Sequence, residues 1–212
     1  MRFQEHLDSC VVLLLAAGSS SRLGRSKQLI SINGEPLLLK SVNAAISSGI
    51  KNIIVVLGAN ENEHRRLIEK LPVEIIFNPT WQKGMGNSLK VGLSHLLKKD
   101  TNLIGVITMV CDQPMITASH LIKLIERFKE TKSSIVASFY SGSAGVPALF
   151  EKSLFEMMLS INDEHGAKKI INQYPDLVSV VDFPEGEIDI DTEEDLKRFI
   201  ENPLSTSPRS KG

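Results

Sequence analysis

One stretch near the N-terminus, residues 11–29, constrains the fold of this chain more than any other. It begins as a continuous apolar run, VVLLLAA, and passes through Gly18 and three serines to the basic residues Arg22, Arg25 and Lys27. A short apolar run that stops at a turn signal is typical of a buried strand in a parallel sheet. Small residues after such a strand let the backbone approach a ligand, and the N–H groups of the loop can hold an anion. The nearby cations favour a polyanion, most simply the phosphates of a nucleotide.

The stretch matches neither of two common phosphate-binding motifs. The dinucleotide fingerprint G-x-G-x-x-G is absent because Ser20 stands where its second glycine would be, which disfavours a dinucleotide-dependent oxidoreductase. The P-loop ends in Gly-Lys-Ser/Thr, whereas Gly24 is followed by Arg25. The residues alone leave open an ordinary surface loop, because loops are where exposed polar residues gather.

The same residues resemble a family signature. LAAGSSSRLGRSK, with NGEPL at 33–37, is similar to L-A-A-G-x-S-x-R-x-G-x-x-K and G-x-P-L of the MobA-like NTP transferases, nucleotidyltransferases with a GT-A-like Rossmann fold. The resemblance implies transfer of a nucleoside monophosphate from a nucleoside triphosphate. It also implies that Arg22 and Lys27 neutralise the phosphates as catalytic residues. The nucleotide-binding residues it implies in this loop are Leu15, Ala16, Ala17, Gly18, Ser19, Ser20, Arg22 and Lys27.

Length and composition fit a single α/β domain. The chain has 212 residues, enough for one substantial core, and we expect the domain to span residues 1–201. The polar, Pro- and Ser-rich residues 202–212 are expected to form a disordered tail. The 24 basic and 25 acidic residues are interspersed and give a net charge of -1, which argues against a nucleic-acid-coating surface.

The cysteines and the hydropathy bear on the cellular compartment. The chain has 2 cysteines, Cys10 and Cys111, without metal-like spacing, which indicates a reduced, cytoplasmic protein. No apolar stretch is long enough to cross a membrane, so we expect no membrane association. Residues 11–17 are too short, and follow acidic residues too closely, for a signal peptide.

Apolar periodicity predicts alternating strands and helices. The pattern is typical of βαβ units with right-handed crossovers in a three-layer α/β/α domain with a mostly parallel mixed sheet. Ligands of such sheets bind outside the C-terminal strand ends, where the loop after residue 17 lies. Strands are expected at 11–17, 51–57, 73–77, 103–110, 134–139 and 188–190, and helices at 36–48, 61–70, 84–98, 117–130 and after 192.

Two glycines and a serine open the expected helix at 84–98. The backbone at its N-terminus could hold phosphate or oxygen ligands, or Asn87 or Ser88 could simply cap the helix. Residues 78–93 resemble the second motif of the molybdenum cofactor cytidylyltransferases, N-P-x-W-x-x-G-M-x-x-S-L-x-x-G-L. This resemblance implies that Ser88 helps to read cytosine, and it favours CTP over GTP. The nucleotide-binding residues implied here are Gly84, Met85, Gly86 and Ser88.

Aspartates at strand ends are the candidate metal ligands. Asp112 follows the strand at 103–110, and Mg²⁺ is commonly held by one or two carboxylates together with substrate phosphates. An Asx turn before Pro114 is the alternative. The segment resembles the family pattern G-D-Q-P, with Cys111 replacing the glycine, which makes Asp112 a catalytic residue and a metal ligand. Asp191, in a segment similar to D-I-D-T-x-x-D-L, would be the second ligand, and alternation places Asp189 on the same face.

The acceptor side is described less well by the sequence. Gly145 and Pro147 belong to a segment similar to the family's G-x-P-x-L-F, although a turn would explain the glycine equally well. In residues 162–169, Glu164 and Lys168 stand where the family pattern G-D-x-G-A-R has aspartate and arginine. Lysine lacks the bidentate fork of arginine, so this segment departs from the family pattern on the acceptor side.

The resemblance as a whole predicts a Mg²⁺-dependent enzyme that transfers CMP from CTP to the terminal phosphate of a molybdopterin-type acceptor and releases pyrophosphate. A recipient molybdoenzyme or its chaperone would be a protein partner. Two alternatives stay open: a nucleotidyltransferase with GTP or another acceptor phosphate, and a non-catalytic protein that binds and delivers nucleotide or cofactor. Nothing in composition or spacing selects the pterin, which rests on the resemblance alone.

Overall fold

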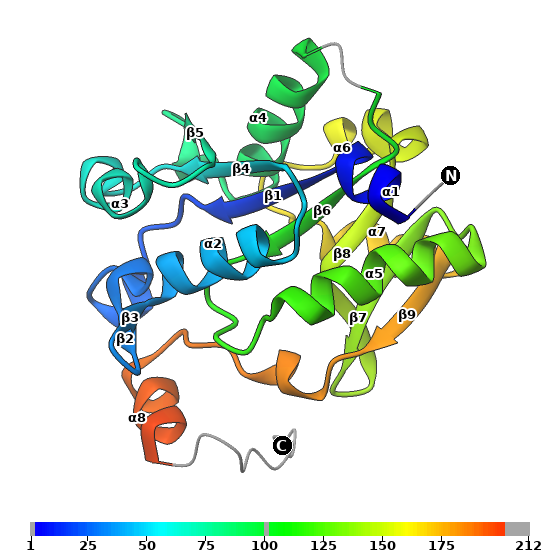
Figure 1. The fold of residues 1–212 in the computed structure, drawn as a ribbon. Helices are drawn as coiled ribbons and strands as arrows, with labels where there is room; N and C mark the ends of the chain where they lie inside the picture. The colour runs from blue at the N-terminus through cyan, green and yellow to red at the C-terminus, as the bar shows by residue number, and fades with distance from the viewer. Residues whose placement is uncertain (1–2, 100–101, 202–212) are drawn as a thin grey trace.

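A seven-stranded mixed sheet forms the centre of the computed structural model, which describes residues 3–99 and 102–201 (Figure 1). The strand order is β5-β4-β1-β6-β8-β7-β9, and β8 pairs antiparallel with both of its neighbours whereas the other pairs are parallel. The strands are β1 Cys10–Ala16, β4 Asn52–Leu57, β5 Glu74–Phe77, β6 Gly105–Val110, β7 Ile135–Tyr140, β8 Ser143–Glu151 and β9 Val178–Asp182.

Helices cover both faces of this sheet, which confirms the predicted three-layer α/β/α class. The helices are α1 Phe3–Ser9, α2 Leu37–Ser47, α3 Glu61–Ile68, α4 Met85–Lys98, α5 Ala118–Thr131, α6 Phe155–Ser160, α7 Lys168–Gln173 and α8 Glu193–Glu201. Alternate residues of β1 belong to two different cores: Val12 and Leu14 pack with α2, α3 and α5, whereas Val11 and Leu13 pack with α4, α6 and α7.

A third, smaller core attaches the C-terminal helix to the loop after β1. Leu23 and Ile30 of that loop pack with Leu196 and Phe199 of α8. A short hairpin, β2 Ser31–Ile32 and β3 Glu35–Pro36, contributes Ile32 to the same cluster. The loop after β1 and the C-terminal helix therefore lie together at one end of the molecule, where α8 lies apart from the sheet (Figure 1).

The strands predicted near 11–17, 51–57, 73–77, 103–110 and 134–139 are all present as β1, β4, β5, β6 and β7. The strand predicted at 188–190 is wrong. Its alternating isoleucines reflect packing, because Ile190 belongs to the third core and Ile188 packs against it. The segment makes a backbone bond from Ile190 N to Asp112 O at 3.1 Å, and it has no ladder partner among the described residues.

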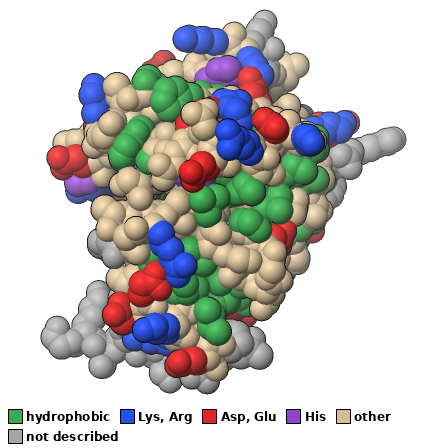
Figure 2. Space-filling model, turned by 90° about the vertical axis from the view of Figure 1, so that its left-hand side faces the viewer, with side chains coloured by type: hydrophobic (Ala, Val, Ile, Leu, Met, Phe, Trp, Pro, Cys, Tyr) green, Lys and Arg blue, Asp and Glu red, His purple; other side chains and the backbone are tan. Residues whose placement is uncertain are grey.

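The surface and the ends bear on the remaining expectations. On the face that carries α3, the β2–β3 hairpin and α8, acidic and basic side chains are interspersed (Figure 2). Within the described residues, no helix is long and apolar enough to cross a membrane. The tail predicted at 202–212 lies outside the described residues.

Candidate functional site

The loop after β1 begins at the C-terminal edge of the sheet, between the ends of β4 and β6. Of the residues predicted to bind nucleotide, Leu15, Ala16 and Ala17 are buried, whereas Gly18 and Ser19 are exposed. Ser20 has a left-handed backbone with φ of 57°, which is uncommon for a residue with a side chain. The chain therefore turns sharply where it leaves the sheet, and the exposed Gly18 and Ser19 are open to a ligand there.

Gly58, at the end of β4, makes this turn sterically possible. A side chain at this position would lie 2.5 Å from Ala17 O and 2.7 Å from Trp81 Cβ. The close approach lets Ala59 N donate to Ala17 O at 3.0 Å, which ties the loop to the neighbouring strand. Sequence reasoning missed this residue, although a glycine at the end of an apolar run is a signal for close backbone approach.

The side chain of Gln28 holds the loop from within. Its Nε2 donates to Ala16 O at 3.1 Å and to Gly18 O at 2.9 Å. Its Oε1 accepts from Ser20 Oγ at 3.2 Å and from Ser26 Oγ at 2.8 Å. Gln28 is buried, and its bond to Ala16 O is buried with it. This residue was also missed by sequence reasoning.

Lys27 brings together the residues predicted to be catalytic and metal-binding. Its ammonium donates to Asp112 Oδ2 at 2.8 Å and to Asp191 Oδ1 at 2.6 Å. The Lys27, Asp112 and Asp191 side chains are 15%, 19% and 29% exposed, so the group lies in a partly dry recess. Burial lowers the pKa of Lys27, but the two carboxylates act more strongly in the opposite direction and raise it above its ordinary value.

Main-chain contacts fix the two carboxylates relative to each other. Asp112 is separated from the end of β6 by Cys111, and the bond from Ile190 N to Asp112 O holds the 188–191 segment beside it. Asp195 Oδ2 accepts from the backbone N–H of Asp191 at 3.3 Å and of Thr192 at 3.0 Å. These bonds orient Asp191 from the start of α8.

Asp189, the alternative to Asp191, lies beside the same group. It is exposed, and its pKa is raised to about 7, first because surrounding protein partly removes it from water and then by the negative charges of Asp112 and Asp191. Lys168 acts on it in the opposite direction. Asp189 thus extends the acidic side of the recess toward Lys168.

The donor set suits a hard divalent cation. Asp112 Oδ1 is buried and has no hydrogen-bond partner, although its other oxygen binds Lys27. Two carboxylates with one unsatisfied oxygen match the ligands that Mg²⁺ or Mn²⁺ prefers. Within residues 3–99 and 102–201 no cluster of three or more His, Cys, Asp or Glu side chains could hold a metal. Ligands beyond the protein, such as phosphate oxygens and water, would have to complete the coordination.

The glycines predicted to bind nucleotide at the start of α4 pack against another loop. A side chain at Gly84 would lie 2.6 Å from Asp163 O, and one at Gly86 would collide with Asn162 O. Asn87 N donates to Asp163 O at 3.0 Å across this contact. Met85 is 47% exposed and covers Gly166. The 162–166 loop and the N-terminus of α4 are therefore one unit.

Ser88 is part of a buried polar cluster centred on Asn78. Asn78 Nδ2 donates to Ser88 Oγ and to Asn87 Oδ1, each at 3.0 Å, and its Oδ1 accepts from Thr80 N at 3.0 Å. Ser88 is 3% exposed. The alternative that Asn87 or Ser88 caps α4 is wrong, because the N-cap is Gly84 and no side chain caps the helix.

The residues predicted to bind the acceptor fall into two groups. Gly145 and Pro147 lie buried inside β8, where the Tyr140 hydroxyl covers Gly145. Glu164 and Lys168 are exposed, one in the 162–166 loop and the other at the start of α7. The charge of Lys168 acts on Asp189, so Glu164 and Lys168 lie on the side of the acidic recess. Gly145 and Pro147 belong to the sheet beneath it.

Of the two arginines in the loop, the structure describes the side-chain contacts of Arg25 only. Arg22 lies in a 3-10 turn at Ser21–Leu23, and its side chain lies outside the described part of the chain. Arg25 makes two hydrogen bonds to Glu193 at the start of α8, from Nε to Oε1 at 2.9 Å and from Nη2 to Oε2 at 3.1 Å. Arg25 is thus engaged by α8.

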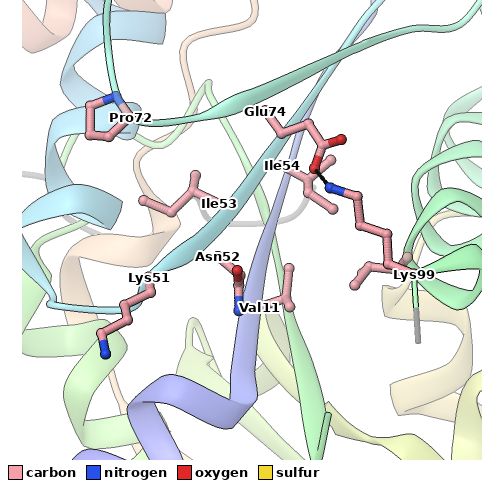
Figure 3. Close-up of a pocket in the computed structure, with 9 residues that line it drawn as sticks. Val11, Lys51, Asn52, Ile53, Ile54, Pro72, Glu74 and Lys99 are labelled. Atoms are coloured by element: carbon pink, nitrogen blue, oxygen red, sulfur yellow. Dashed lines mark hydrogen bonds and ion pairs between the residues drawn. The ribbon is translucent and has the colours of Figure 1, made fainter. Parts of the chain in front are cut away.

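A cavity of about 120 Å³ lies at the opposite edge of the sheet (Figure 3). It is lined by Val11, Asn52 and Glu74, the residues at which β1, β4 and β5 begin or nearly begin. Lys99 reaches across it to Glu74, while Lys51 points away from that pair. Because it is at the N-terminal strand ends, it is separate from the recess around Lys27.

Comparison with known proteins identifies the family. A MobA-like NTP transferase domain matches residues 12–178. The chain belongs to the MobA-like NTP transferase family. It is accordingly a nucleotidyltransferase by class, as the loop after β1 predicted.

Similar proteins carry several names. A nicotine blue oxidoreductase of Paenarthrobacter nicotinovorans is 28% identical to this MobA-like chain over 202 residues, covering 90% of this chain and 97% of that protein. Purine catabolism protein PucB of Bacillus subtilis is 26% identical over 169 residues, covering 75% of this chain and 78% of PucB. The crystal structure of Rv0371c from Mycobacterium tuberculosis superposes with a TM-score of 0.76 at 23% identity, covering 92% of this chain and 98% of that one.

Other relatives use different nucleotides by name. One is a 3-deoxy-manno-octulosonate cytidylyltransferase of Wigglesworthia glossinidia, 23% identical over 71% of this chain and 60% of that protein. Another, from Thermococcus sibiricus, is named a probable molybdenum cofactor guanylyltransferase and is 24% identical over 69% of this chain and 71% of that protein. Rv0371c has also been solved in complex with manganese. These two relatives are therefore both named as nucleotidyltransferases, and their names differ in the base.

Proposed function

We propose that this nucleotidyltransferase transfers CMP from CTP to the terminal phosphate of a molybdopterin-type acceptor. The observation that carries the proposal is the contact of the Lys27 ammonium with both Asp112 and Asp191 at the sheet edge where the loop after β1 begins. A cation and two carboxylates next to an exposed glycine-serine turn supply what a triphosphate and its counter-ion require. Each of these residues lies in a segment that carries the family pattern.

The reaction needs little covalent help from the protein. An oxygen of the acceptor phosphate attacks the α-phosphorus of CTP, a new P–O bond forms, the bond to the β-phosphate oxygen breaks, and pyrophosphate leaves. The acceptor phosphate is already a nucleophile, so catalysis consists of alignment and charge neutralisation. Lys27, together with Arg22, would neutralise charge on the triphosphate and on the five-coordinate phosphorus. The exposed backbone from Gly18 to Ser20 would hold the phosphates.

Asp112 and Asp191 would hold the divalent cation, which we propose to be Mg²⁺. When bound, such a cation supplies positive charge next to the phosphates and orients them. The unpaired, buried Asp112 Oδ1 supports this assignment, because an ionised oxygen without a partner is costly to bury. The Lys27 ammonium lies between the two carboxylates and pairs with both of them. It would turn toward phosphate when the cation binds.

The preference for cytosine rests on residues 78–93. Asn78 donates to Ser88 Oγ, so the Ser88 hydroxyl keeps its own proton to donate. The exposed edge of cytosine carries two acceptors, O2 and N3, which a hydroxyl donor suits. Gly84, Met85 and Gly86 would support this contact by fixing the start of α4 against the 162–166 loop. The acceptor would lie on the side of Glu164 and Lys168, above Gly145 and Pro147, and a molybdoenzyme or its chaperone would receive the product.

Pyrophosphate release tests the proposal. The purified protein is incubated with Mg²⁺, bare or molybdenum-loaded molybdopterin, and CTP, GTP or ATP in parallel. Release with CTP alone is expected. Release with GTP instead would be consistent with the role assigned to Lys27, Asp112 and Asp191, but it would contradict the role of residues 78–93 in choosing cytosine. No release with any of the three would contradict the acceptor, and would favour binding and delivery without chemistry.

One observation favours a second candidate function. The relative from Paenarthrobacter nicotinovorans covers 90% of this chain and is named an oxidoreductase. A hydride transfer between a nicotinamide and an aromatic substrate would need no carboxylate pair around Lys27. Oxidation of NADH or NADPH with an aromatic dye as acceptor tests it. Dye reduction that survives replacement of Asp112 would support this second function.

A further inference from the structure

The bonds around Gln28 fix the orientation of its side-chain amide. The amide nitrogen meets two carbonyl oxygens, Ala16 O and Gly18 O, which can only accept. The amide oxygen therefore accepts from both serine hydroxyls, Ser20 and Ser26. All four hydrogen-bonding positions of the side chain are used, and reversing the amide would set its oxygen against the two carbonyl oxygens and break both of those bonds.

The Ser26 hydroxyl links this amide to a histidine outside the loop. His64 Nε2 lies 2.6 Å from Ser26 Oγ. Because Ser26 gives its single proton to Gln28 Oε1, the bond to His64 must run from Nε2–H to Ser26 Oγ. Protons therefore point one way along the chain, from His64 to Ser26 to Gln28, and from Gln28 to the two carbonyls.

His64 is suited to be a fixed anchor. It lies in α3, has an exposed fraction of 0%, and its Nδ1 is buried without a hydrogen-bond partner. Protonation would place an unpaired N–H at that atom, which costs free energy in a dry site. Burial accordingly lowers the pKa of His64 below its ordinary value, against smaller opposing effects of Glu63 and Glu61. The neutral ring with hydrogen on Nε2 is the form that the geometry requires.

We infer that His64, acting through Ser26 and Gln28, is a positioning residue that holds the loop after β1 in its ligand-ready conformation. Gln28 binds the carbonyl oxygens of Ala16 and Gly18, which fixes the orientation of the backbone on both sides of Ala17. Ser20 Oγ accepts from Lys27 N at 3.0 Å, which extends the same set of bonds to the residue that contacts Asp112 and Asp191. The functional part of this inference rests on the proposed nucleotidyl transfer, whereas its structural part does not.

The chain offers a matched control for the histidine. His120 is also buried, and its Nε2 also bonds a serine hydroxyl, Ser138 Oγ, at 2.7 Å. It lies in α5 and stacks on Phe183, away from residues 16–28. His120→Leu therefore removes a similar buried ring and a similar bond without touching the loop. His64→Gln is the conservative variant, because its amide can still donate to Ser26.

Hydrogen exchange of the nucleotide-free protein tests the inference directly. In His64→Leu, amides of residues 16–30 are expected to exchange about tenfold faster than in the wild type, as the loss of one buried bond implies. Gln28→Glu, which removes both donors to the carbonyls, should accelerate the same amides at least as much. His64→Gln and His120→Leu should leave them unchanged.

Unchanged exchange of residues 16–30 in folded His64→Leu would overturn the inference, as would equal acceleration in His120→Leu. Equal acceleration in His64→Gln would overturn the role of the donated hydrogen bond. The proposed function is tested separately by wild-type pyrophosphate release, so its failure leaves the exchange result readable. Where the wild type transfers a nucleotide, His64→Leu should raise KM for the triphosphate by about tenfold, and His120→Leu should not.

Discussion

Lys27 is the residue at which three distant segments of the chain meet. It comes from the loop after β1, Asp112 follows β6, and Asp191 precedes α8. The partly buried ammonium is held charged by both carboxylates. A charge of this kind is more effective in a recess than in open solvent, because little reorganisation is needed when a ligand's charge develops.

Lys27→Ala is expected to lower turnover a hundredfold or more, about 2.7–4 kcal/mol, if the ammonium acts chiefly in the transition state as one oxyanion donor does. Steady-state pyrophosphate release measures it. Lys51→Ala is the control, because Lys51 is an exposed lysine that pairs with Asp8 at the other edge of the sheet. Near-normal turnover of Lys27→Ala would contradict the assigned role.

Asp191 and Asp189 can be separated by substitution. Asp191 shares the Lys27 ammonium with Asp112, whereas Asp189 is exposed and faces Lys168. Asp191→Asn is therefore expected to raise the Mg²⁺ concentration needed for half-maximal turnover by about tenfold or more. Asp189→Asn should change it little. The reverse pattern, measured by Mg²⁺ titration and by Mn²⁺ binding without nucleotide, would make Asp189 the ligand.

At the scale of elements, α8 is attached to the loop by its start and by its apolar face. Thr192 and Asp195 form a capping box: Thr192 N and Oγ donate to Asp195 Oδ2 at 3.0 and 2.8 Å, and Asp195 N donates to Thr192 Oγ at 3.1 Å. The Arg25–Glu193 pair is exposed and contributes little. Capping and the third core therefore hold the helix, and with it Asp191.

Thr192→Ala tests the contribution of the cap. Loss of a capping hydroxyl is expected to lower the free energy of unfolding by about 1 kcal/mol. Urea unfolding at pH 7 measures it as a shift of the midpoint at constant slope. Thr131→Ala, at the other end of a helix, is a control, because its hydroxyl binds Arg127 O and Ser179 Oγ instead of capping an N-terminus. An unchanged midpoint in Thr192→Ala would contradict the cap.

The sequence predicts the elements whose patterns are local. The buried parallel strands are continuous apolar runs, and the strand-end rule places Lys27 and Asp112 at one edge. β8 was not predicted because it contains Gly145 and Pro147, which weaken a strand pattern. The sheet accommodates them by a register shift between Ala137 and Ser138 of β7. Gln28 and His64 could not be found either, since their role depends on a tertiary bond through Ser26.

At the scale of the whole molecule, the position of the recess follows from topology. β1 lies between β4 and β6, so the chain crosses from β1 to one side of the sheet and later returns to the other. A crevice at the C-terminal strand ends is the result wherever the strand order reverses in this way. α8 and the 162–166 loop then border this end of the sheet, so the recess is formed by segments from different parts of the chain.

Stability of the whole domain should depend on pH through its buried histidines. Burial, with a smaller effect of Lys123, lowers the pKa of His120 from its ordinary 6.5 to about 4. Between these values the unfolded chain binds a proton that the folded one excludes, so stability rises with pH. The contribution of His120 is complete above pH 6.5, falls as the pH decreases toward 4, and is of order 3 kcal/mol at most. His64, whose pKa is also lowered, acts with the same sign.

Asp189 acts in the opposite direction over the same range, because its pKa is raised to about 7 and acid relieves the repulsion from Asp112 and Asp191. The wild-type profile alone therefore cannot isolate the histidine, and the difference from His120→Gln can, since Asp189 is common to both proteins. The stability advantage of the wild type over His120→Gln, from urea unfolding, should be largest at pH 7 and should shrink steadily toward pH 4. A difference that stays constant with pH would mean that His120 has the same pKa in the folded and the unfolded protein. Its burial would then not couple proton binding to folding.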